Sequence, residues 1–185
     1  MATAKRRILQ GQSLPGYPPE IGTWLWAMEA VRQRKLRLVE GLDQRTLDWE
    51  GLDARENGIG SLLYHIAGVE VGWLFIDILL QPDLPASLKV DFPFESRNAE
   101  GRLTPVLGVP LDEHLGRLTR SRRTFLDTFR EIPAEEWRRL RHPDGEDYAV
   151  TPEWAVFHLV EHEAGHAFQI SSLKARAKRH FGSRA

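Results

Sequence analysis

The chain has 185 residues, 42% of them hydrophobic and 28% charged, with a formal net charge of −1. This composition is typical of one soluble globular domain rather than a disordered chain, and the near-neutral charge gives no field that would draw the protein onto nucleic acid or a membrane. The absence of cysteine excludes disulfides, thiolate nucleophiles and cysteine-ligated zinc sites, and it fits a reducing compartment.

Residues 1–17 are expected to form an N-terminal extension of a single domain that spans residues 1–185. Their basic residues are not followed by the apolar stretch of a secretory signal. No window approaches the roughly 18 consecutive apolar residues of a membrane span. The strongest candidate, residues 69–80, is too short and contains two acidic residues. We therefore expect a cytoplasmic protein with no membrane or nucleic-acid partner.

Two long helices are predicted in the first half of the chain. The first covers residues 19–41, where apolar residues recur near helical spacing after a Pro-Pro pair. The second covers residues 58–80 and ends before Gln81-Pro82, because proline cannot continue a helix. Residues 81–110 contain five prolines and are expected to form a long connection that crosses the bundle.

Two more helices are predicted in the second half. One follows Pro110 and ends near residue 131, with acidic residues in its first turn, where the helix dipole favours them. The turn sequence of residues 142–145, His-Pro-Asp-Gly, predicts a small hairpin. The last helix begins at Thr151-Pro152, a capping residue followed by proline at the first helical position, and ends near residue 180. Together these features predict an all-α four-helix bundle with a long crossover connection.

The histidines are unevenly placed. His158, His162 and His166 follow one another at intervals of four residues on one stripe of the last helix. Two imidazoles one turn apart can converge on a cation, and a third from a facing helix completes three corners of a tetrahedron. His65, on the apolar face of the second helix, is such a third residue. His158 and His166 are roughly 12 Å apart along the axis, so all three of the last helix cannot bind one ion.

The alternative to a metal site is a set of core histidines, each satisfied by hydrogen bonds. The remaining histidines lie among charged or turn residues and are expected to be exposed to solvent: His114, His142 and His180.

Residues 162–166, His-Glu-Ala-Gly-His, match the H-E-x-x-H signature of zinc peptidases, in which the glutamate is the general base. Such enzymes usually take a third ligand downstream. Here the metzincin spacing falls on Ser172, and residues 167–185 contain no acidic residue. His180 is roughly 20 Å beyond His166 on a continuous helix. A zinc peptidase is therefore the least favoured interpretation.

The segments around His65 and His162 resemble the histidine motifs of the DinB-like superfamily. Residues 61–70, SLLYHIAGVE, are similar to its first motif, and residues 158–170, HLVEHEAGHAFQI, to its second. The resemblance covers residues 21–173. It implies a four-helix bundle, often a homodimer, that holds one divalent metal ion, zinc or alternatively nickel, manganese or iron, through His65, His162 and His166. The chain departs from the family at Ala167-Phe168, where Arg-Gly or a second histidine often follows the last ligand.

The resemblance also implies a chemistry. Relatives use the metal to activate a low-molecular-weight thiol, such as bacillithiol or mycothiol, for S-transfer or isomerisation. We therefore expect a metal-dependent, thiol-dependent S-transferase, or a related transferase or hydrolase, that acts on a small electrophilic substrate. Two alternatives stay open: a metal- or ligand-binding bundle without catalysis, and a purely structural bundle.

Two groups of residues near the histidines are each open to two interpretations. Glu161, Glu163 and Gln169 are candidates for orienting the imidazoles or a ligand, although for Glu163 a simple surface or interhelical hydrogen bond is favoured. Gly68 and Gly72, one turn apart near His65, either clear room for a substrate or permit close helix contact.

Overall fold

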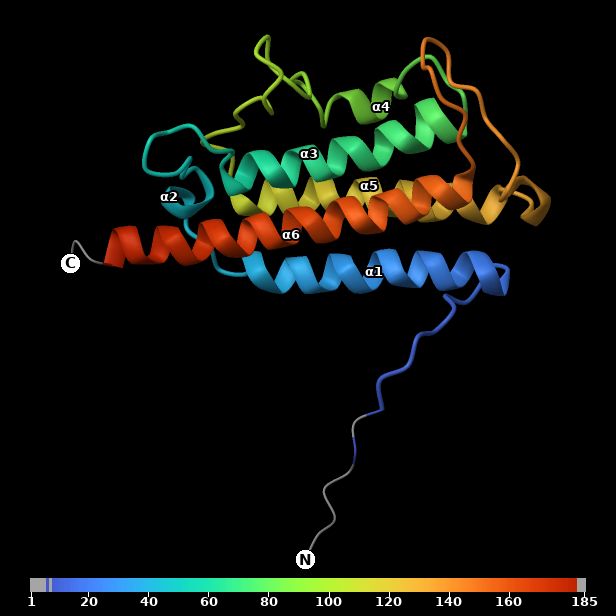
Figure 1. Cartoon of the computed structure of the whole chain (residues 1–185), viewed down its shortest axis with the longest axis horizontal. Coiled ribbons are helices and arrows are strands. Elements are labelled where there is room, and N and C mark those ends of the chain that lie inside the picture. The colour runs from blue at the N-terminus through green and yellow to red at the C-terminus, as the bar shows by residue number, and fades with distance from the viewer. Residues whose placement is uncertain (1–5, 7, 183–185) are drawn as a thin grey trace, which may run out of the picture.

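The computed structural model describes residue 6 and residues 8–182, so part of the predicted N-terminal extension lies outside the described residues. Four long helices lie side by side along one axis (Figure 1). Helix α6 packs along both α1 and α3, and α5 packs along α3. The predicted all-α fold is confirmed. The long helices are α1 (Pro19–Val39), α3 (Ile59–Gly72), α5 (Leu111–Glu131) and α6 (Pro152–Gly182).

The connections hold three short helical elements: α2 (Gln44–Leu47), α4 (Ala86–Lys89) and the 3-10 turn η2 (Ala134–Glu136). The long crossover, which includes α4, passes over α3 before α5 begins (Figure 1). The predicted hairpin is reduced to one isolated antiparallel bridge between Arg141 and Val150, whose two backbone hydrogen bonds measure 2.7 and 3.0 Å. Within the described residues no strand forms on either side of it.

The helix ends follow the predicted signals. Prolines at positions 18, 110 and 152 stand at the starts of α1, α5 and α6, where a missing N–H costs nothing. At the start of α6 the backbone N–H of Trp154 donates to Thr151 Oγ1 at 3.2 Å, which is the predicted cap.

The second predicted helix is a composite. After α3 the chain continues directly as a π-helical segment, η1 (Trp73–Ile78). Just beyond this segment, Leu80 has a positive φ of 53°, which breaks the helix. The backbone N–H of Leu79 donates to the Leu74 carbonyl, five residues earlier, at 3.0 Å. The wider π turn changes where the last side chains of the helix point, and such turns often occur at functional sites.

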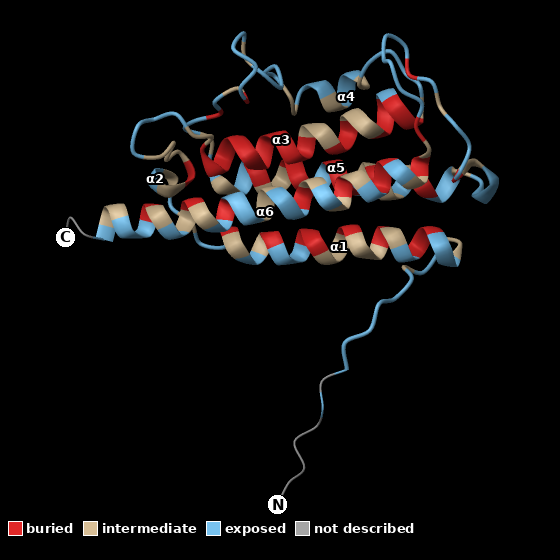
Figure 2. Cartoon of the chain, in the orientation of Figure 1, coloured by how far each residue is buried: buried red, intermediate tan, exposed pale blue. Residues whose placement is uncertain are grey.

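The continuous helix Ile59–Ile78 is long and apolar enough to cross a membrane by length and composition, contrary to the expectation that no segment would be. However, 72% of its most apolar window is buried inside the protein. Figure 2 shows α3 buried along most of its length, between α5 and α6. The segment is therefore the core helix of a soluble bundle, and its apolar composition reflects contact with other helices on several sides.

The core consists of two apolar clusters separated by a layer of charged residues. One cluster contains Phe125 and the fully buried Trp137, and the other contains Leu62 and Ile170. Along each long helix, the charged residues lie between the positions that belong to the two clusters. The buried members of this charged layer are Arg32, Lys35, Glu70, Arg122 and Glu163.

Candidate metal centre

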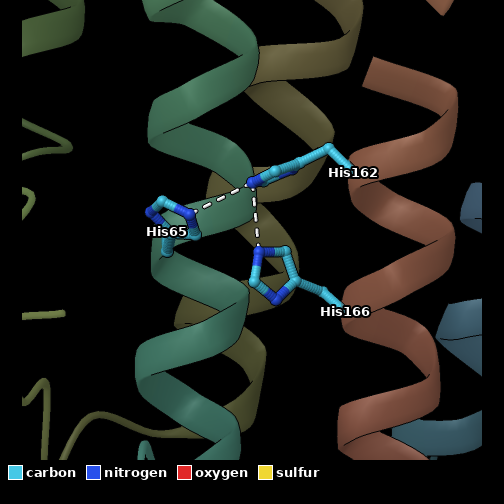
Figure 3. Close-up of side chains that lie close together, drawn as sticks. All are labelled: His65, His162 and His166. Carbon is cyan, nitrogen blue, oxygen red and sulfur yellow. Dashed lines mark hydrogen bonds between the residues drawn. The ribbon is translucent and has the colours of Figure 1, made fainter. Parts of the chain in front are cut away.

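Three histidines meet where α3 faces α6. His65 lies in the middle of α3 and is only 8% exposed, because α3 is covered on several sides. His162 and His166 are one turn apart on α6 and are half-buried. Figure 3 shows the three rings pointing toward one another across the gap between the two helices.

The ring nitrogens of these histidines are close enough to share one ion. His162 Nε2 lies 3.1 Å from His65 Nε2 and 3.0 Å from His166 Nε2. One ligand atom from each residue falls within 4.8 Å of the other two. Two nitrogens bound to one tetrahedral zinc ion at about 2.0–2.1 Å would be roughly 3.3 Å apart. The arrangement therefore fits a cation held by three imidazoles.

Burial keeps these imidazoles neutral, which is the form that binds metal. Burial is the largest cause and the neighbouring histidines of the cluster add to it, so that together they lower the pKa of His65 to about 4 and the pKa of His162 to about 3. Burial also lowers the pKa of His166. At neutral pH each ring therefore carries a single N–H and offers a lone pair on its other nitrogen.

Hydrogen bonding directs the lone pair of His166 toward the other two rings, whereas one nitrogen of His65 has no hydrogen-bond partner. His166 Nδ1 donates to Gln169 Oε1 at 2.8 Å, so that Nε2, the atom that faces the other rings, is unprotonated. His65 Nδ1 is buried and has no hydrogen-bond partner. Three convergent imidazoles cannot satisfy one another with single protons, whereas a divalent cation would accept a lone pair from each.

His158, the third histidine of the α6 stripe, lies outside the cluster. Its ring stacks on Trp154, with centroids 5.3 Å apart and planes within 5°, and it contacts Trp73 at 4.9 Å. The i, i+4 pair that joins His65 is therefore His162 and His166, as the motif resemblance implies.

Glu163 is rotated about 100° around α6 from His162 and enters the charged layer rather than the histidine cluster. It is 3% exposed, and its carboxylate lies 2.5 Å from Arg32 Nε, 2.8 Å from Lys35 Nζ and 3.1 Å from Arg122 Nη2. Burial raises the pKa of Glu163, but the three cations outweigh it and lower the pKa to about 2. The favoured prediction of an interhelical contact is correct. The zinc-peptidase interpretation loses its general base, because this carboxylate is fully engaged in the core.

The sequence analysis did not predict the charged layer, and it did not predict the burial of His114. Glu70 binds Arg32 at 2.5 Å and also pairs with Arg122, so the layer joins all four long helices. The signal for it was a lone glutamate in the apolar α3. His114 is 1% exposed, contrary to prediction, because its ring is covered by α3 near Gly60 and by the crossover. His142 is exposed as predicted, while His180 is half-buried against Trp49.

An open groove of about 730 Å³ adjoins the histidine cluster, with His65 in its wall. It follows α3 and η1 on one side and the crossover residues 83–96 on the other. A Cβ added at Gly72 would meet no atom within 4 Å, and one at Gly68 would meet only the Phe92 ring at 3.6 Å. These glycines therefore face open space, which supports the first of their two predicted roles.

Comparison with known proteins agrees with this arrangement. The family model described as the DinB superfamily matches residues 27–170, a span that contains all three clustered histidines. No curated protein matches the chain.

Proposed function

The chain belongs to the DinB superfamily, and from that premise we propose that it is a metal-dependent enzyme that uses an external low-molecular-weight thiol to attack a small electrophilic substrate. The observation that carries the proposal is the convergence of His65, His162 and His166 beside an open groove. A site with three protein ligands and an open position is the arrangement of catalytic rather than structural zinc. We propose zinc as the ion, with nickel, manganese or iron as alternatives.

In this proposal the three histidines would hold the cation and the adjoining groove would admit the substrate. A divalent cation at three neutral imidazoles would act as a Lewis acid that favours the thiolate form of a thiol. The chain has no cysteine, so the thiol must come from solution. In the transfer, a carbon–sulfur bond forms as the leaving group departs with its electron pair, and the thiol proton passes to solvent.

Two further features belong to this proposal. We propose a cytoplasmic homodimer, since α6 exposes three large hydrophobic side chains, Trp154 at 48%, Phe157 at 41% and Phe168 at 76%. Light scattering on the purified protein tests the dimer, which requires twice the 21.2 kDa chain mass.

The alternative function is a metal or ligand sensor, which would use the same cluster without turnover.

Metal content tests the site directly. Protein purified without an affinity tag, then equilibrated with zinc, should hold about one ion per chain by elemental analysis. His162→Ala should bind zinc more than about 100-fold more weakly, because a ligand is lost rather than a group that only orients one. His158→Ala is the matched control on the same stripe and should bind like the wild type. Equal zinc binding by the wild type and His162→Ala would contradict the metal site.

Turnover separates enzyme from sensor. Zinc-loaded protein mixed with a small thiol and an alkyl halide should release halide faster than the uncatalysed reaction, and the excess rate should vanish in His162→Ala. A zinc-loaded wild type that gives no excess rate with a panel of thiols and electrophiles would favour the sensor.

A further inference from the structure

The groove beside the histidine cluster has a second end, at Asp77. His65 and Asp77 both line it and lie on the continuous helix formed by α3 and η1. Twelve residues separate them in sequence, which corresponds to about 18 Å at α-helical rise. Gly68 and Gly72 lie between them and present no side chain to the groove. The space therefore suits an elongated molecule that reaches from the cluster to Asp77.

The charge of the groove is unbalanced. Four carboxylates line it and only one ammonium group, Lys89, which is paired with the carboxylate of Asp83. At the other end, Arg97 lies close enough to His65 and His166 to lower the pKa of both imidazoles. The side chains that line the groove therefore carry more negative than positive charge. The other three carboxylates are those of Asp77, Glu95 and Glu146.

Asp77 is the carboxylate best placed to hold a ligand. It is 7% exposed, and its Oδ1 accepts a hydrogen bond of 2.5 Å from the Tyr148 hydroxyl. Among the described residues this is the one side-chain hydrogen bond to the Asp77 carboxylate. Burial raises the pKa of Asp77, since the hydroxyl compensates only part of the buried charge. A cation bound at Oδ2 would supply the rest.

Aromatic rings flank this carboxylate. Trp73 stacks on Tyr148 with centroids 6.1 Å apart and planes at 30°, and both residues line the groove. Trp73 also contacts Trp154, with ring centroids 5.6 Å apart. A carboxylate beside aromatic faces is a favourable environment for an alkylammonium group, because the ring quadrupole and the negative charge both attract it.

We propose that the groove is a binding site for substrates with a cationic amine at the end remote from the reacting atom, with the amine held by Asp77 beside the contacting rings of Trp73 and Tyr148. The direction of the substrate rests on the proposed function, which places the chemistry at the histidines. The amine site itself rests only on the groove, so the two proposals can fail separately.

Calorimetry with three probes of equal chain length tests the site: hexylamine, hexanol and hexanoate, each titrated into the full-length protein with and without zinc. Hexylamine should bind at least about tenfold more tightly than hexanol, and hexanoate most weakly. This preference should be present without zinc, because Asp77 lies far from the cluster. Equal binding of hexylamine and hexanol would overturn the amine site even if zinc binding and turnover were intact.

Variants locate the amine. Asp77→Asn keeps an acceptor for Tyr148 and should bring hexylamine binding to the level of hexanol, whereas Asp83→Asn, whose carboxylate is already paired, should leave the preference within about threefold. Tyr148→Phe keeps the carboxylate and should retain the preference, which also guards against a loss caused by misfolding of Asp77→Asn. Loss of the preference in Asp83→Asn or Tyr148→Phe, or its survival in Asp77→Asn, would overturn the assignment to Asp77.

Discussion

Two adjacent residues of α6, His162 and Glu163, have side chains in chemically different surroundings. The carboxylate of Glu163 enters a layer in which acidic and basic side chains from four helices satisfy one another. The imidazole of His162 enters a cluster in which all partners are of its own kind. Buried polar groups that find opposite charges inside the protein serve the fold, whereas convergent groups of one kind require a partner from outside.

The comparison also shows how the two regions depend on each other. The charged layer holds α6 in a fixed rotation against α1 and α5, because Glu163 is bound by Arg32 and Lys35 of α1 and by Arg122 of α5. His162 and His166 leave the same stretch of helix at fixed angles to Glu163, so their direction toward His65 follows from that rotation.

Removal of the Glu163 carboxylate should have the largest effect on the fold. Glu163→Ala leaves three buried cations without this partner, and we expect a loss of about 3–5 kcal/mol in the free energy of unfolding. Urea denaturation of the zinc-free protein measures it. Glu161→Ala, an exposed glutamate two residues away, should change stability by less than about 0.5 kcal/mol. Similar losses in the two variants would mean that the charged layer contributes little.

The sequence predicted the helices and the grouping of His65, His162 and His166 better than the core. Helix ends were recognisable because proline and capping residues act locally, as at Pro110 and Thr151. The pair His162 and His166 was identifiable from helical spacing, and its choice over His158 came from the motif resemblance. These are signals that lie within a few residues of one another.

What could not be predicted depends on contacts between distant segments. His114 lies among charged residues in sequence, yet α3 and the crossover cover it. The charged layer needs residues from four helices to arrive at one level, and the groove needs the crossover to stand off from α3. No spacing rule within one helix encodes either arrangement.

His114 shows what burial does to a histidine that has no cluster. Burial lowers its pKa to about 4, with a further contribution from Arg117, so the folded protein resists the protonation that the unfolded chain undergoes near pH 6.5. Below pH 6.5 the unfolded state therefore binds more protons, and stability falls as pH falls toward 4, by at most about 3 kcal/mol from this residue.

Urea denaturation at pH 7 and pH 5 measures this dependence on acid. His114→Gln should lose less stability between the two pH values than the wild type does. An identical loss in the variant and the wild type would show that the pKa of His114 is not lowered in the folded protein, and that the acid sensitivity comes from other groups.

Gln169 tests the histidine side at its outer edge, where the smallest effect is expected. Its Oε1 fixes the tautomer of His166 by accepting the Nδ1 proton, so Gln169→Ala should weaken zinc binding by about tenfold, or 1.4 kcal/mol, without changing the stability of the zinc-free protein. Gln169→Glu retains an acceptor at the same place and should restore the affinity. Competition against a chelator measures both. A change in zinc-free stability without a change in affinity would give Gln169 the same structural role as Glu163, and the division between the charged layer and the histidine cluster would then not extend to this residue.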